Sequence, residues 1–181
     1  TFKLQSGLKM HLYFDSRLSQ EIYCGDFERK ERQFLNDYSR EGEIFVDIGA
    51  NIGLFTLIAS HNVGEKGQVY SFEPCSKTYE RLIKNVYLNE MNNAKCFQIA
   101  LSGHTGRVEM NMSLDGYDAC NSIAQPTAGN SFTVETVRAV KWKVSFLKQT
   151  WTLECCSSRT MKKWIWRHAK AYRSSSVSTK S

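Results

Sequence analysis

A short apolar run that enters an aspartate and a glycine-containing turn limits this chain to few folds. Residues 43–48, EIFVDI, are β-branched and aromatic without strict alternation, which indicates a buried parallel strand covered on both faces. Gly49 and Gly53 lie in the turn, and apolar residues then resume at helical spacing until Gly64. A strand that passes through such a turn into a helix predicts a sheet with crossover helices.

The alternation of strand and helix continues along the chain. Residues 67–74 (GQVYSFEP) predict a second strand, residues 76–93 a helix capped by Ser76 and ended by Asn92 and Asn93, and residues 94–101 a third strand. The order β-α-β-α-β predicts an α/β fold with a Rossmann-like parallel sheet. Residues 107–112 and 131–140 alternate without a preceding helix, so antiparallel additions to that sheet are expected.

One polar helix is predicted upstream of the first strand, over residues 19–42. Asp26 can cap it, a thin apolar stripe runs along it, and Gly42 is expected to end it. Residues 1–42 are therefore interpreted as a lead-in to the predicted sheet, which spans residues 43–142.

Polar residues gather where the first two strands end. Ligands bind at the carboxyl ends of strands in a doubly wound sheet, and Asp47, Asn51 and Glu73 all lie at these positions. Gly49 and Gly53 permit unusual backbone angles and a close approach of a ligand. Solvated loop acids and an ordinary tight turn are the alternative interpretation.

The spacing of the glycines bears on the class of ligand. The turn reads Gly-x-x-x-Gly, and Asn51 stands where a dinucleotide fold has the glycine that approaches a pyrophosphate. A cationic ligand without phosphate fits an acidic strand end better. Glu73, 20 residues after Gly53, is placed to accept hydrogen bonds from both hydroxyls of a ribose.

These stretches resemble a known family. VDIGANIGLFT, VYSFEP, LNEMNN and IALSGHTGRVEM, with GDFERKERQFL upstream, are similar to the FkbM-type S-adenosylmethionine-dependent methyltransferases, over roughly residues 21–140. The resemblance implies a class I, Rossmann-like fold with S-adenosylmethionine as cofactor. It also implies that the turn from Asp47 to Gly53 lines the methionine end, that Glu73 holds the ribose, and that Ala100 lies near the adenine.

The activity implied by the resemblance is O-methylation of a hydroxyl on a sugar, a natural product or another small molecule, without a metal. No catalytic base is named. His61 and His104 are candidates that surface loops explain as well, and Asn121 and Ser122 lie in a polar loop that can either approach the acceptor or form a plain turn.

The character of the chain changes near residue 142. Residues 1–142 hold 15 basic and 17 acidic residues, a net charge of −2, whereas residues 143–181 hold nine basic residues and one acid, a net charge of +8. The further strand of the family, which ends in a motif like Asp-Val-Glu-Gly, is not found here, so the C-terminal part of the usual fold is expected to be absent or diverged. Residues 143–181 can be a genuine basic, Trp-rich tail without order, a truncated or frame-shifted reading, or a diverged remainder.

Several alternatives follow for function and location. One is an NAD(P)-dependent oxidoreductase, which the missing middle glycine disfavours; another is a non-catalytic module whose basic tail binds nucleic acid. Six cysteines without a CxxC pair argue against zinc and for a reducing, cytoplasmic setting. No membrane span or signal peptide is expected, and a chain that starts at Thr1 rather than Met is expected to be a fragment.

Overall fold

The computed structural model describes residues 1–4, 6–25, 27–117, 121, 123, 131–141, 151–158 and 161–168. The helices are α1 (Arg17–Cys24), α2 (Arg29–Tyr38), α3 (Leu54–Val63) and α4 (Ser76–Leu88). The strands are β1 (Phe2–Lys3), β2 (Lys9–Met10), β3 (Ile44–Ile48), β4 (Gln68–Phe72), β5 (Ala94–Phe97), β6 (Ala100–Ser102), β7 (Gly106–Ser113), β8 (Phe132–Lys141), β9 (Trp151–Ser158) and β10 (Met161–His168).

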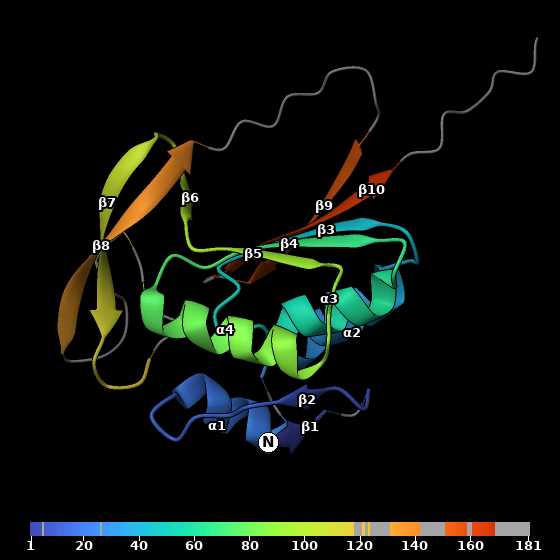
Figure 1. Cartoon of the computed structure of the whole chain (residues 1–181), viewed down its shortest axis with the longest axis horizontal. Helices are drawn as coiled ribbons and strands as arrows, with labels where there is room; N and C mark the ends of the chain where they lie inside the picture. Colours follow the sequence, from blue (N-terminus) through green and yellow to red (C-terminus); the bar gives the residue numbers. More distant parts are fainter. Residues whose placement is uncertain are drawn as a thin grey trace, which may run out of the picture.

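The main sheet has the strand order β5-β4-β3-β10-β9. Its β3–β4 and β4–β5 pairs are parallel, which confirms the Rossmann-like α/β arrangement predicted from the sequence. In Figure 1, α2, α3 and α4 lie together on one face of this sheet. The sequence predicted no strand after residue 142, but β9 and β10 form an antiparallel pair, and β10 continues the sheet antiparallel to β3. The proposed division at residues 42 and 142 stays a prediction.

The third predicted strand, residues 94–101, is divided between two sheets. β5 ends at Phe97 and stays in the main sheet, whereas β6 begins at Ala100 and pairs in parallel with β8. β7 pairs antiparallel with β8, so the two alternating segments form a second, three-stranded sheet of order β6-β8-β7 and do not extend the parallel one. Figure 1 shows this second sheet beyond the ends of the main sheet and α4.

The prediction of one helix over residues 19–42 is wrong. The chain forms α1 and α2. Gly25, at φ 86°, ends α1, and its N–H donates to the carbonyls of Glu21 and Ile22. Such a left-handed residue cannot continue a helix. α2 ends at Tyr38, before Gly42, and the predicted cap Asp26 lies outside the described residues.

The start of α4 also differs from the prediction. Its cap position is Cys75, which makes no side-chain capping bond, and Ser76 is the first helical residue. The N–H of Ser76 donates to the carboxylate of Glu135 on β8, at 3.2 Å to Oε1. A carboxylate at a helix N-terminus complements the helix dipole, so the second sheet replaces the expected local cap. The helix ends at Leu88, four residues before Asn92.

The main hydrophobic core lies between the main sheet, its helices and the N-terminal segment. It joins buried residues of β3 and β4 to α3 and, beyond the helices, to α1 and the β1–β2 pair, as Figure 1 shows. Its members are Leu4, Leu8, Met10, Leu18, Ile22, Leu35, Phe45, Ile52, Leu54, Phe55, Leu57, Ile58, Ala59, Val63 and Val69. Within the described part of the chain, none of the helices has both the length and the hydropathy needed to cross a bilayer.

An ion-pair cluster fixes the N-terminal segment to α4. Asp15 lies 2.6 Å from the Nζ of Lys77 and 2.7 Å from Nη2 of Arg81, whose guanidinium stacks on Tyr13 at 3.9 Å from the ring centroid. Hydrogen bonds from Lys77 and then from Arg81 lower the pKa of Asp15 to about 2. Because the pKa of Asp15 is lower in the folded state, its contribution to stability is complete above its ordinary value of 3.8 and is lost as the pH falls towards 2.

We expect Lys77→Met to raise the pKa of Asp15 towards its ordinary value, because the strongest hydrogen bond to the carboxylate is removed. Carboxyl NMR titration of the wild type and the variant measures this shift. Lys66→Met removes a comparable exposed pair with Glu41 and serves as the control, which should leave Asp15 unchanged. A wild-type midpoint near 3.8 would contradict the role assigned to this cluster.

Candidate functional site

The register of the two central strands brings the predicted site residues to one edge of the sheet. Asp47 on β3 lies opposite Ser71 on β4, so Gly49 and Glu73, each two residues further along, lie side by side beyond the strand ends. The Asn51 N–H donates to Oε2 of Glu73 at 2.8 Å. The glycine turn and the second acid are therefore in direct contact.

The turn between β3 and α3 is built from left-handed residues. Gly49, Asn51 and Gly53 have φ values of 75°, 50° and 94°, and Asn51 tolerates this conformation because its Oδ1 accepts the N–H of Ile52 at 2.7 Å. The N–H groups of Gly49 and Ala50 both donate to the carbonyl of Phe72, at 2.9 and 3.0 Å. The turn is thus attached to the end of β4 through both backbone and side chain.

Glu73 is the centre of this network. Its side chain is 5% exposed, and Oε1 accepts from the Cys75 N–H at 3.0 Å and from the Thr78 hydroxyl at 2.8 Å. Burial raises the pKa of Glu73, while the hydrogen bonds from Thr78, Cys75 and Asn51 oppose that rise. The thiol of Cys75 also donates to this carboxylate, so four protein donors meet its roughly four acceptor positions, and a ligand hydroxyl would replace one of them.

Asp47 points into the interior beneath α3. It is fully buried, and its Oδ2 accepts from the Thr56 hydroxyl at 2.7 Å, which in turn lies 2.8 Å from the hydroxyl of Ser71. Burial, and then the charge of Asp47, raises the pKa of the neighbouring Cys96 thiol to about 11. The sequence suggested that Asp47 could pair with a ligand's ammonium group or hold a backbone donor; in the structure it fastens helix α3 to the sheet.

The two glycines of the turn meet different surroundings. No atom lies within 4 Å of the place where a Cβ on Gly49 would stand, so a ligand can approach the backbone there. A Cβ on Gly53 would stand 2.7 Å from Cδ1 of Leu82 on α4. The open space at Gly49 beside a buried carboxylate fits a nucleoside that carries ribose hydroxyls.

Some of the other predicted residues lie near this edge of the sheet, and others lie elsewhere. Ala100 packs with Cys75, two residues after Glu73, in a second buried cluster with β7 and β8. Asn121 also reaches Cys75, with Nδ2 3.7 Å from its Sγ. His104 lies exposed in the β6–β7 turn and His61 lies on the last turn of α3, away from the glycine turn. Ser122 lies outside the described residues. The ligand contacts of all these residues stay predictions.

Three residues that the sequence analysis did not select hold the site together. Thr78 and Thr56 each donate a hydroxyl to one of the two acids. Asn85 on α4 is fully buried; its amide donates to the Ile52 carbonyl at 2.8 Å and accepts the His11 N–H at 2.7 Å. One sequence signal could have identified Thr56, Thr78 and Asn85. Each is a polar residue on the buried face of a helix, where apolar residues are expected.

Comparisons with known proteins agree with this geometry. A model of the TRM5/TYW2 methyltransferase domain matches residues 12–117, which are more than half of the chain. Methyltransferase sdnD from Sordaria araneosa is 33% identical over 96 residues, which are 51% of this chain and 35% of that protein. The chain therefore spans about a third of the length of this curated relative.

Solved methyltransferase structures resemble the chain more weakly. TYW2 from P. horikoshii, solved in complex with MeSAdo, is 19% identical, with a TM-score of 0.37 and coverage of 56% of this chain and 41% of that one. A SAM-dependent methyltransferase from Aquifex aeolicus is 21% identical, with a TM-score of 0.36 and coverage of 44% and 45%. These scores are too low to support an argument about function.

The family match and the strand-end geometry agree on one class of protein. The broader part of the expected identity, a class I methyltransferase, is confirmed, whereas nothing singles out the FkbM type within that class. The chain belongs to the TRM5/TYW2 methyltransferase domain family, and its cofactor is S-adenosylmethionine.

Proposed function

We propose that this chain forms the cofactor-binding part of an FkbM-like O-methyltransferase that methylates a hydroxyl of a sugar, a natural product or another small molecule. The observation that supports it most is the hydrogen bond from the Asn51 N–H to Glu73. This bond joins the glycine turn to the acid that is expected to bind the ribose. The 33% identity to methyltransferase sdnD from Sordaria araneosa supports methyl transfer as the reaction.

Each half of the site has a separate task in this proposal. Glu73 accepts a ribose hydroxyl in place of the weak thiol donor of Cys75, and the backbone at Gly49 lines the methionine end. Ala100, which packs with Cys75 in one buried cluster, is expected to lie near the adenine. The bound cofactor supplies an activated methyl group on a sulfonium. The protein's contribution is to hold that group in line with the acceptor hydroxyl and to exclude water.

Binding of S-adenosylhomocysteine, measured by isothermal titration, tests the cofactor half of the proposal. We expect the wild-type chain to bind it and Gly49→Ala to bind it about tenfold or more weakly, because the added Cβ enters the open space that the ligand needs. Gly7→Ala is a matched control, since Gly7 also has a positive φ, 86°, with no atom within 4 Å. Equal affinities of the two variants, or no heat from a folded wild-type sample, would contradict the site.

The hydroxyl preference needs a separate measurement. With methyl-labelled S-adenosylmethionine, we expect label to enter ether linkages of sugars or hydroxylated natural products. Mass spectrometry of the products identifies the methylated atom. Label found on nitrogen or carbon atoms, or in RNA alone, would remove the O-methyltransferase proposal and leave the cofactor site intact.

We also place this reaction in the cytoplasm. The three cysteines whose side chains the structure describes, Cys24, Cys75 and Cys96, are free thiols. Free thiols persist in reducing compartments, which supports this placement.

A further inference from the structure

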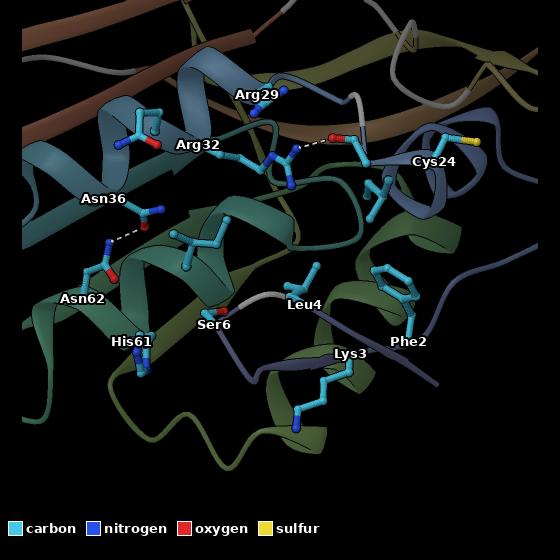
Figure 2. A pocket seen from close by; sticks show the side chains of 14 residues that line it. Phe2, Lys3, Leu4, Ser6, Cys24, Arg29, Arg32, Asn36, His61 and Asn62 are labelled. Carbon is cyan, nitrogen blue, oxygen red and sulfur yellow. Dashed lines mark hydrogen bonds between the residues drawn. The ribbon is translucent and has the colours of Figure 1, made fainter.

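A cavity of about 460 Å³ lies away from the glycine turn. It is enclosed by the N-terminal strand β1, the end of α1, one face of α2 and the second half of α3, as Figure 2 shows. On α3 it is lined by Ile58 and His61. His61 is seven residues, or about 10 Å of helix, from Leu54, where α3 begins next to the glycine turn (the cofactor edge of the sheet). The volume is in the range of small-molecule sites.

The charged side chains that line this cavity, among the described residues, are all positive. Lys3, Arg29 and Arg32 line it, and none of its described lining residues is acidic. None of the ion pairs found among the described residues involves these three side chains. Glu28 and Glu31, at the start of the same helix, are not among the lining residues. Three cations without an acidic neighbour among the described lining residues favour an anionic ligand.

Arg32 is held in position for such a ligand. Its Nη2 donates to the Gly25 carbonyl at 2.6 Å, a contact drawn as a dashed line in Figure 2, and this bond fixes the guanidinium. Its Nε is buried and has no acceptor among the described residues. A buried guanidinium donor without a partner costs free energy, and a phosphate oxygen would remove that cost. Arg29, one turn before it on α2, lies beside it in Figure 2.

The opposite wall of the cavity is apolar. Phe2, Leu4, Ile22 and Ile58 line it, and Figure 2 shows Phe2 and Leu4 across the cavity from the two arginines. A third side is closed by amides, where Nδ2 of Asn62 donates to Oδ1 of Asn36 at 3.2 Å. The cavity therefore suits a molecule with a multiply charged anionic end and a flat or apolar end.

We propose that this cavity binds a nucleoside diphosphate, with its phosphates on Arg29 and Arg32 and its base against Phe2 and Leu4. The planar guanidinium of Arg32 matches the geometry of phosphate oxygens, and Arg29 adds a second cation. This site is separate from the cofactor edge, so its ligand and S-adenosylmethionine bind independently.

Isothermal titration of the full chain with adenosine diphosphate tests the proposal, with inorganic pyrophosphate and adenosine as the two partial probes. We expect the diphosphate nucleotide to bind most tightly, pyrophosphate more weakly, and adenosine barely, with affinity that falls as salt is added. S-adenosylhomocysteine at saturation should leave this affinity unchanged.

Arg29→Gln removes one cation from an exposed position and should weaken nucleotide binding by about tenfold, the effect of one charge-assisted hydrogen bond. Arg32→Gln should weaken it more. Lys30→Gln is the matched control, because Lys30 is an exposed cation on the same helix that does not line the cavity. Circular dichroism confirms that the three variants remain folded.

Three results would overturn the assignment. The first is no binding of either phosphate compound to folded protein at millimolar concentration, including the case in which only an RNA oligonucleotide binds. The second is an equal loss in Lys30→Gln and Arg29→Gln, which would indicate non-specific attraction. The third is displacement of the nucleotide by S-adenosylhomocysteine, which would place it at the cofactor edge.

Discussion

Glu73→Ala should lower the free energy of unfolding by about 3 kcal/mol or more and abolish binding of S-adenosylhomocysteine. Three buried donors, on Asn51, Cys75 and Thr78, lose their common acceptor in this variant. Each unsatisfied buried donor costs about 1–3 kcal/mol, and removal of a desolvated charge offsets part of that loss. Urea unfolding followed by circular dichroism measures the change.

Two further variants separate the stability effect from general loss of charge. Glu73→Gln keeps an oxygen for the Cys75 and Thr78 donors but places an amide NH₂ group against the Asn51 N–H, so an intermediate loss is expected. Glu80→Ala removes an exposed acid on α4 and should stay within about 0.5 kcal/mol of wild type. If Glu73→Ala were no worse than Glu80→Ala, Glu73 would not be the organising residue of the site.

The parallel core of the fold could be predicted because its sequence signals are local. The apolar runs at residues 44–48 and 68–72 and the helix stop at Gly64 follow from periodicity and turn chemistry, and the register then places Gly49 beside Glu73. The division of residues 94–101 could not be predicted, since it depends on β8, where Ala139, far along the chain, is the partner of Ala100. The single-helix prediction failed because Gly25 was not treated as a stop.

The strand-end positions of the two acids could be predicted, whereas their contacts could not. Composition and spacing identified Asp47 and Glu73 as strand-end acids, but the direction of each side chain depends on its donors. Thr56 draws Asp47 beneath α3, whereas Thr78 and the turn backbone hold Glu73 at the sheet edge. Each threonine is a polar residue on the buried face of a helix, but helical spacing does not show which acid its hydroxyl contacts. This is why the threonine partners were missed while both acids were found.

Of the two glycines in the turn, Gly53 is the one whose substitution should cause a large loss of stability. Gly53→Ala should lower the free energy of unfolding by about 2–4 kcal/mol, because it combines strain at φ 94° with a Cβ 2.7 Å from Cδ1 of Leu82. Leu82 is fully buried and cannot simply rotate away. Gly7→Ala, at φ 86° with open space, carries the strain alone and should cost about 1 kcal/mol.

A double-mutant cycle separates strain from crowding at Gly53. Leu82→Val shortens the side chain that crowds the new Cβ, so Gly53→Ala should cost about 1 kcal/mol less in the Leu82→Val background than in wild type. Chemical unfolding of the four proteins gives this coupling energy. Additive losses would mean that Leu82 does not restrict position 53 and that only the backbone angle requires glycine there.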